Sequence, residues 1–350
     1  MTKRLIKTTF LFMLLTLFVA CGPVANHPTP TPIFGPISAK PGRAAELAPT
    51  VVSSGAGMPG RLLFVKNGDL WLWQGDTGQQ LTNQGDLFQP TWSPNGTRIA
   101  CVQRGASYSD IIIMAANGTE PLRLTNDGQN APSNSFERIY HTLWAFYPAF
   151  SPDGTQVAFV SQAGPPVGEP AAEYNLSLYV TSAAAGGSKQ QLYAAESGQV
   201  GRATYAPDGD LVFTNFSTGQ AAPQLLSYSQ DSGAVAPLPG APDQSYDPAF
   251  SHDGHWLAFA VRMNGRTDIF AMPGKGGAPV QLTNLGTARA PAFSPDGTKL
   301  AFLALAPQAT RFDLWVVNLT PEADGLRVDQ PHQITHNAGI DVDSGLAWSR

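Results

Sequence analysis

The sequence predicts an all-β protein that folds as a six-bladed β-propeller with four antiparallel strands in each blade. Two observations predict this fold. A short motif that ends in a Pro-Asp-Gly-like turn recurs five times, and an alternating apolar segment follows each copy. The two ends of the folded region also carry complementary parts of one further repeat. The chain contains 35 glycines and 30 prolines, which suits many short strands joined by tight turns.

Residues 1–20 have the features of a signal peptide. Three basic residues lie within the first seven, and the apolar stretch 8–20 is too short to span a bilayer comfortably. The stretch leads into LFVACG at 17–22, which resembles a bacterial lipobox and makes Cys21 the expected lipidated residue. The alternative is an ordinary secretory signal that happens to contain a cysteine.

Residues 21–59 are expected to form a tether behind the lipidated cysteine. Eight prolines fall within 22–59, including the run HPTPTP at 27–32. Such a segment favours extended polyproline-like conformations and cannot bury a core. The predicted organisation is therefore a lipoprotein signal peptide over 1–20, a lipidated tether over 21–59 and a propeller over 60–350.

Charge and cysteine content narrow the range of partners and compartments. Loss of residues 1–20 would remove three basic residues and no acidic one, so the formal net charge falls from −5 to −8. An acidic chain without basic clusters is a poor nucleic-acid binder. With Cys21 lipidated, Cys101 has no disulfide partner and is expected in the core. The protein is expected outside the cytoplasmic membrane, facing the periplasm or the cell surface.

Each repeat contains four predicted strands, A to D. The strand A motifs are PTWSPNG (90–96), PAFSPDG (148–154), ATYAPDG (203–209), PAFSHDG (248–254) and PAFSPDG (291–297). The turn residues have clear roles, since Pro presets φ, Asp or Asn accepts local hydrogen bonds and Gly supplies positive φ. Strand B follows each turn with alternating apolar residues, and strands C and D complete the repeat.

The chain ends predict ring closure. Residues 61–82 match strands B, C and D without a preceding strand A, while the last residues, LAWSR, match strand A alone. A C-terminal strand that joins the N-terminal blade would complete six blades and protect two sheet edges. An open solenoid would not need complementary half-repeats.

The repeat, with its PxFSPDG turn followed by an AF pair and a later LT pair, resembles the TolB-type propeller repeat over residues 61–349. The resemblance implies a propeller fold and protein partners. Propellers of this type also serve as scaffolds and as accessory domains of peptidases, so the resemblance indicates the fold more specifically than the function. TolB is a soluble periplasmic protein with an additional N-terminal α/β domain. This chain has a tether instead, which puts the specific Tol–Pal role in doubt.

The strand order divides the loops between two faces. We call the face with the A–B and C–D turns the bottom, and the face with the B–C and D–A connections the top. The longest connections are expected on top, where the segment 126–147 is rich in aromatics. Its expected partner-binding residues are Arg138, Tyr140, His141, Trp144 and Tyr147. The alternative is that these rings fill the gap between blades 2 and 3, with Phe146 the residue expected in the core and Tyr140 and Trp144 the residues expected to be exposed.

Acidic residues in the D–A connections are weak candidates for a metal site. They are Asp86, Asp243, Asp247, Asp341 and Asp343, of which all but Asp243 are the candidate Ca²⁺ ligands. Solvated loop acids are the favoured interpretation. The recurring acids of the A–B turns and those that begin strand C (Asp69, Asp110, Asp268 and Asp313) are expected to be structural.

The leading functional hypothesis is a monomeric, non-enzymatic envelope lipoprotein that binds a protein or peptide partner, without a cofactor. No catalytic motif is recognisable, although an enzyme is not excluded. The alternative is a propeller that binds or degrades polysaccharide, with His141, Arg202, Arg289 and the loop acids converging on the channel. A sensory domain for a small ligand is a third possibility.

Overall fold

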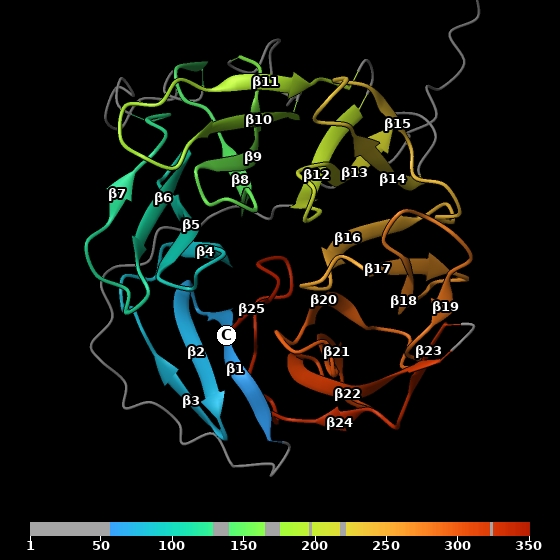
Figure 1. Cartoon of the computed structure of the whole chain (residues 1–350). Coiled ribbons are helices and arrows are strands. Elements are labelled where there is room, and N and C mark those ends of the chain that lie inside the picture. Colours follow the sequence, from blue (N-terminus) through green and yellow to red (C-terminus); the bar gives the residue numbers. More distant parts are fainter. Residues whose placement is uncertain (1–56, 129–139, 165–175, 196–197, 218–221, 323–324) are drawn as a thin grey trace, which may run out of the picture. The chain divides into compact units, whose positions relative to one another are not determined.

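The structure, a computed structural model, confirms the six-bladed β-propeller. It describes residues 57–128, 140–164, 176–195, 198–217, 222–322 and 325–350. Six antiparallel sheets surround a central channel, and the first strand of each blade lies innermost (Figure 1). Within the described residues, no helix is long and apolar enough to cross a membrane.

The first three blades use the strands up to β11 together with the C-terminal strand. Blade 1 contains β25 (Ala347–Ser349), β1 (Met58–Lys66), β2 (Asp69–Gly75) and β3 (Thr77–Gln80). Blade 2 contains β4 (Leu87–Trp92), β5 (Arg98–Arg104), β6 (Ser109–Ala115) and β7 (Leu122–Arg123). Blade 3 contains β8 (Ala145–Phe150), β9 (Gln156–Gln162), β10 (Leu176–Ser182) and β11 (Gln190–Tyr193).

The other three blades follow in chain order. Blade 4 contains β12 (Gly198–Tyr205), β13 (Leu211–Ser217), β14 (Pro223–Tyr228) and β15 (Val235–Pro237). Blade 5 contains β16 (Ser245–Phe250), β17 (Trp256–Met263), β18 (Arg266–Pro273) and β19 (Val280–Gln281). Blade 6 contains β20 (Arg289–Phe293), β21 (Lys299–Leu305), β22 (Phe312–Glu322), β23 (Gly325–Val328) and β24 (His332–Gln333). In blade 6, β22 and β23 form a hairpin within 319–331, where the sequence predicts only a long C–D loop.

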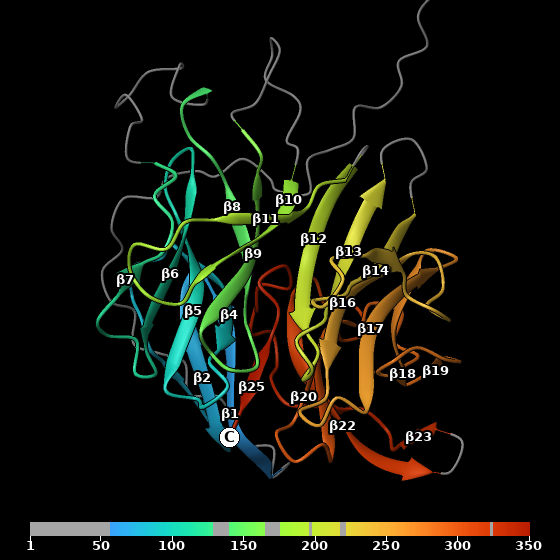
Figure 2. The same cartoon turned by 45° about the horizontal axis from the view of Figure 1, so that its top comes forward.

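The C-terminal strand closes the ring as predicted. β25 pairs with β1, with Leu62 opposite Trp348, and the C-terminus lies beside β1 in both views (Figures 1 and 2). The indole nitrogen of Trp348 donates a 2.6 Å hydrogen bond to the Pro59 carbonyl, and Arg61 Nε donates to the Arg350 carbonyl at 2.9 Å. β1 begins at Met58, two residues before the expected start of the propeller.

Apolar residues pack between neighbouring blades. The six buried clusters correspond to the six interfaces between adjacent sheets. Cys101 is fully buried in the cluster between blades 1 and 2, as predicted. Because each blade buries both of its faces, the strands need apolar residues on both sides, and only the outer strands and the turns are exposed.

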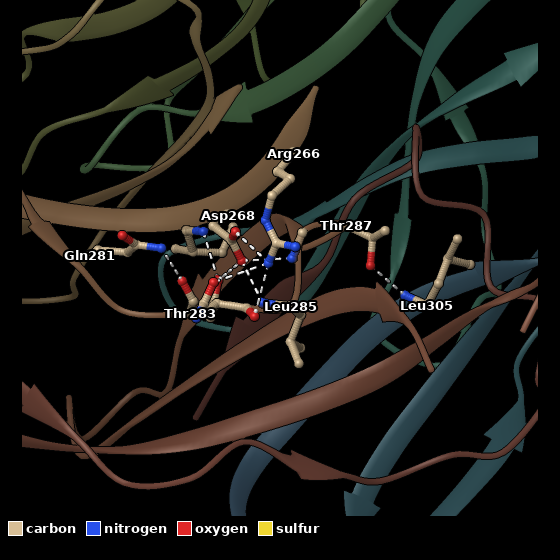
Figure 3. Close-up of polar contacts among 10 residues, drawn as sticks. Arg266, Asp268, Gln281, Thr283, Leu285, Thr287 and Leu305 are labelled. Atoms are coloured by element: carbon tan, nitrogen blue, oxygen red, sulfur yellow. Dashed lines mark hydrogen bonds and ion pairs between the residues drawn. The ribbon is translucent and has the colours of Figure 1, made fainter. Parts of the chain in front are cut away.

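A repeated carboxylate–threonine pair holds the top of four blades. In blade 5 the Asp268 carboxylate accepts hydrogen bonds from the Thr283 hydroxyl at 2.9 Å, Leu285 N at 2.7 Å and Gly286 N at 3.0 Å (Figure 3). The Thr283 hydroxyl in turn accepts from Ile269 N. The same pairing joins Asp69 to Thr82, Asp110 to Thr125 and Asp313 to Thr335. These acids are structural, as predicted, because each satisfies the first backbone groups of the next D–A connection.

The acids of the A–B turns are structural as well. Asp153 accepts from the Ser151 hydroxyl at 2.6 Å and from Thr155 N at 3.0 Å. Asn95, Asp253 and Asp296 make the equivalent bonds in their own turns. The Ser151 and Thr155 bonds lower the pKa of Asp153 to about 2, so the turn keeps its charge over the physiological range.

Candidate functional site

The innermost strands carry a repeated β-bulge that faces the channel. In blades 2 to 6, two consecutive residues of the inner strand lie opposite one residue of the second strand. In four of these blades the first bulge residue has positive φ and a proline follows it: Gln89, Tyr147, Asp247 and Ala290. Proline is tolerated there because an inner edge has no neighbouring strand to receive its N–H. Each left-handed non-glycine residue costs about 1–3 kcal/mol, a strain typical of functional positions.

Five residues from five blades meet at the top end of the channel. We call them the channel cluster: Tyr147 in β8, Arg202 in β12, Asp247 in β16, Arg289 in β20 and Asp343 in the connection to β25. Arg289 lies 3.4 Å from Asp247 and 3.2 Å from Asp343. Arg202 Nε lies 3.6 Å from a carboxylate oxygen of Asp247, and Arg202 Nη2 donates a 3.0 Å hydrogen bond to the Asp343 carbonyl.

Blade 2 joins the cluster through an amide. Gln89 Oε1 accepts a 2.8 Å hydrogen bond from Tyr147 N, which couples the bulges of blades 2 and 3. The guanidinium of Arg202 lies over the Tyr147 ring at 4.9 Å. All six blades therefore contribute to one connected polar network around the channel.

Burial shapes the electrostatics of the channel cluster. The Asp247 side chain is only 11% exposed, whereas Asp343 is 39% exposed and forms the solvent side. Burial raises the pKa of Asp343, and the nearby Asp341 and Asp247 raise it further against the effect of Arg289. Burial also raises the pKa of Tyr147 to about 12, so its phenol stays protonated at neutral pH. Burial lowers the pKa of Arg289, but the anionic Asp247 and Asp343 together with Tyr246 and Tyr147 outweigh this effect, and the net shift is upward.

The channel continues below the cluster as a cavity of about 210 Å³. Inner strands of all six blades line it, from Arg202 and Asp247 down to the A–B turns at Pro94 and His252. Its volume is below the roughly 300–1,000 Å³ of typical small-molecule pockets, so it suits a side chain or a chain end better than a large cofactor.

The predicted partner-binding residues separate in the structure. Arg138 lies outside the described residues. His141 is exposed in the connection before β8, while Tyr140 and Trp144 are half-buried. Tyr147 is a strand residue of the channel cluster, because β8 begins at Ala145 and the connection is shorter than expected. Within the described part of the chain, no hydrogen bond or ion pair joins His141 to Arg202 or Arg289.

Trp144 contributes to the core as well as to the surface. Its ring stacks on Phe146 at 5.9 Å, nearly parallel, and Phe146 is buried as predicted. The prediction that Trp144 is exposed is therefore only partly correct. The stack continues to Tyr147, 6.1 Å from Phe146, and so connects the blade 2–3 connection to the channel cluster.

The candidate metal ligands do not form one site. Asp247 and Asp343 are engaged by Arg289. Asp86 accepts from Gln103 at 3.1 Å, and Asp341 caps the backbone N–H of Ser344 at 2.9 Å. In the described ranges, no group of three or more His, Cys, Asp or Glu side chains is placed to hold a metal ion.

Sequence reasoning missed the bulge itself and the role of Gln89. The available signal was the residue that precedes the first proline in four of the five strand A motifs, which is Gln, Tyr, Asp or Ala in blades 2, 3, 5 and 6. This variation at a fixed position of a regular repeat marks residues that the fold does not require. The polysaccharide hypothesis has His141, Arg202, Arg289 and the loop acids converging on the channel, and of these residues the structure brings Arg202 and Arg289 together around Asp247.

Comparisons with known proteins support the fold. No protein-family model matches the chain. TolB from Acinetobacter baumannii is 21% identical, with a TM-score of 0.61 over 84% of this chain and 67% of that one. A chain of a nidogen/laminin complex is 13% identical, with a TM-score of 0.55 over 82% of this chain and 97% of that one. The tricorn protease is 16% identical, with a TM-score of 0.54 over 83% of this chain and 26% of that one. The chain therefore has a TolB-like six-bladed propeller fold, which binding proteins and enzymes share.

Proposed function

We propose that this protein is a non-enzymatic envelope lipoprotein whose propeller binds a protein or peptide partner on its top face. The observation that carries the proposal is the convergence of charged and polar residues from all six blades on one end of the channel. Partly buried charges and strained bulges cost folding free energy. A ring without a ligand could close its channel with apolar residues alone, so a partner is the simplest reason for this arrangement.

The chemistry of the channel cluster suits recognition. Guanidinium groups such as Arg202 and Arg289 bind carboxylates and carbonyl oxygens with defined geometry. The raised pKa of Tyr147 makes its phenol a hydrogen-bond donor and a poor nucleophile at neutral pH. The members of the cluster include no Ser, Cys or His that could form a nucleophile–base pair.

The proposed anchor fits the placement of the chain ends. β1 starts at Met58 and β25 ends at Ser349, and both of these ends lie at the bottom of blade 1. A tether from a lipidated Cys21 would join the propeller at Met58, on the bottom of blade 1. The location that follows is extracytoplasmic and membrane-anchored.

A second candidate function is the binding or degradation of polysaccharide in the channel. The raised pKa of Asp343 beside Arg289 and Asp247 favours it, because a carboxyl group with a raised pKa can serve as a general acid. Turnover of an envelope glycan that depends on Asp343 would move the assignment to this class.

The test is affinity capture from crosslinked native envelopes with the full-length protein. Arg289→Met should lose the captured partner, whereas Arg266→Met should retain it, because the Arg266 side chain lies on the top face but outside the cluster and is 56% exposed. Thermal melts must show that both variants fold.

A second variant tests the aromatic connection. Tyr140→Ala with Trp144→Ala should also reduce capture. Capture of the same protein partner by wild type, the Arg289 variant and the aromatic variant alike would contradict the proposal. Capture of polysaccharide alone would favour the second candidate function.

A further inference from the structure

Arg104, at the top of blade 2, is a half-buried arginine whose guanidinium no protein group bonds. It is the last residue of β5, and within the described part of the chain no hydrogen bond or ion pair engages its side chain. The other half-buried arginines of the described ranges all donate hydrogen bonds through their guanidinium groups: Arg61, Arg98, Arg202 and Arg289. A partly buried cation without a close counter-charge is unfavourable, so the position of Arg104 requires a reason.

The strand register directs Arg104 toward the channel. In the β4–β5 pair, Phe88 of the inner strand lies opposite Val102. Arg104 is two residues after Val102 and therefore points to the same face of the sheet. Its guanidinium lies over the Phe88 ring, 3.8 Å from the ring centroid. Because Phe88 directly precedes the bulge residue Gln89, this contact holds Arg104 beside the bulge of blade 2.

The guanidinium is buried at one nitrogen and open at the other two. Arg104 Nε has essentially no accessible surface and no hydrogen-bond partner. Nη1 and Nη2 also lack a partner but are not buried, so both can be reached from solvent. Since Phe88 covers one face of the guanidinium, a ligand can approach along the edge that carries Nη1 and Nη2.

The charges around Arg104 belong to the mouth of the channel. Burial lowers the pKa of Arg104, and the nearby Asp341, Tyr147 and Asp343 only partly offset this effect. Tyr147 and Asp343 are members of the channel cluster, so Arg104 lies near the same end of the channel. Asp343 forms its ion pair with Arg289 instead. The charge of Arg104 is therefore balanced only at a distance.

We propose that Arg104 binds an acidic side chain of the protein or peptide partner. A carboxylate placed end-on against Nη1 and Nη2 accepts two parallel hydrogen bonds, the geometry in which guanidinium groups recognise carboxylates. The stack on Phe88 orients the guanidinium before the ligand arrives, so less conformational entropy is lost on binding. This inference rests on the proposed function and names one anchor of the partner.

The acids near Arg104 favour a ligand group with a single negative charge. Asp341 and Asp343 both act on the charge of Arg104. They would repel a phosphate, which carries nearly two charges, more strongly than a carboxylate. Asp and Glu side chains of a protein supply such a carboxylate. The uronic acids of a glycan supply it too, so the experiment separates the two sources.

The discriminating variant is Arg104→Met. Methionine keeps an unbranched side chain that can pack on Phe88, but it removes the charge and both Nη donors. If Arg104 serves binding, this variant melts at or above the wild-type temperature, because it removes a partly buried cation without a close partner. Arg104→Lys keeps a charge without the planar fork and should recover only part of the lost affinity.

The matched control is Arg262→Met, at the same position of the repeat in blade 5. Arg262 N donates to the Gln244 carbonyl at 3.0 Å, just as Arg104 N donates to the Asp86 carbonyl at 2.8 Å. Arg262 is exposed, so its loss tests the effect of one positive charge on the top face alone. Peptide affinity should change less than about twofold at physiological salt.

The experiment selects linear twelve-residue peptides from a phage-displayed library on the full-length protein in detergent. Each enriched peptide is synthesised as selected and with each Asp or Glu replaced in turn by Asn or Gln. Calorimetric titration of these peptides into wild type and Arg104→Met completes a double-mutant cycle. The proposal expects one acid-to-amide change to weaken binding to wild type at least about tenfold and binding to Arg104→Met less than about twofold.

An acid-to-amide loss of equal size on both proteins would overturn the inference. Failure to enrich any peptide, or peptides that bind Arg104→Met as tightly as wild type, would also overturn it. A hexuronic acid oligomer is titrated in parallel, and binding of this oligomer alone that depends on Arg104 would replace the acidic peptide with a glycan. If envelope capture requires Arg289 but not Arg104, the inference fails and the proposed function stands.

Discussion

Ring closure by the C-terminal strand gives the sharpest stability prediction. Deleting residues 345–350 removes β25, with Trp348 7% and Leu346 9% exposed in the blade 1–6 cluster. Truncating a buried Trp costs roughly 3–5 kcal/mol and a buried Leu roughly 2–5 kcal/mol. Their sum is comparable with the whole stability of a domain, about 5–15 kcal/mol. The deleted chain should therefore lose its cooperative melt and aggregate.

The single change Trp348→Ala should give a measurable intermediate. It removes the ring and its 2.6 Å hydrogen bond to the Pro59 carbonyl. A loss of about 4 kcal/mol corresponds to a fall in Tm on the order of 10 °C for a domain of this size. Leu122→Ala is the control, because Leu122 is 37% exposed on an outer strand and should melt like wild type. A chain that lacks 345–350 yet melts cooperatively at the wild-type temperature, by circular dichroism and calorimetry, would refute the closure.

Three further predictions test the Asp–Thr pair, the lipid anchor and Tyr147 of the channel cluster. Asp268→Ala leaves three donors without their acceptor, and the free energy of unfolding in urea should fall by about 3–5 kcal/mol. Gln224→Ala, at the corresponding exposed position of blade 4, should lower it by less than about 0.5 kcal/mol. Equal losses would mean that the Asp–Thr pair does not stabilise the blade. Cys21→Ser should move the protein from the membrane to the soluble fraction, and persistent membrane association would show that the anchor is elsewhere. Because the pKa of Tyr147 is raised to about 12 in the folded state against about 10 unfolded, its stabilising contribution is intact below pH 10 and lost between pH 10 and 12. The stability advantage of wild type over Tyr147→Phe should shrink across that window in urea midpoints, and a constant difference would contradict the pKa shift.

The fold was predictable because the repeat carries its information locally. Turn residues such as Asp153 and Gly154 and the alternating strand B residues recur at fixed spacing, and each position has one physical role. The half-repeats at the two ends then determine the number of blades and the closing strand. A pattern repeated six times averages out the ambiguity that affects a single short strand.

The candidate site was less predictable because it depends on register. The bulge interrupts alternation for two residues, and sequence alone does not reveal which residue, Tyr147 or its neighbour, turns toward the channel. The aromatic segment 126–147 includes Tyr147, which the structure places in the channel cluster, and Trp144, whose ring stacks on Phe146. The hydrogen bond from Tyr147 N to Gln89 gave no signal, because it joins two blades and is recognisable only when their relative positions are known.

The Asp–Thr pairs are unevenly distributed over the six blades. Blades 1, 2, 5 and 6 fasten their top connections with an Asp–Thr pair, whereas blades 3 and 4 carry Ser177 and Gln224 where the others carry Asp. Tyr193 stands in place of the threonine in blade 3, and its ring contacts Phe213 of blade 4 at 5.2 Å. Blades 3 and 4, which lack this stabilising pair, are neighbours in the ring and pack against each other. Natural proteins commonly sacrifice stability where they bind, so introducing the Asp–Thr pair into blade 3 with Ser177→Asp and Tyr193→Thr should reduce capture of the partner more than it changes the fold. Undiminished capture by that double variant would show that the missing pairs are unrelated to recognition.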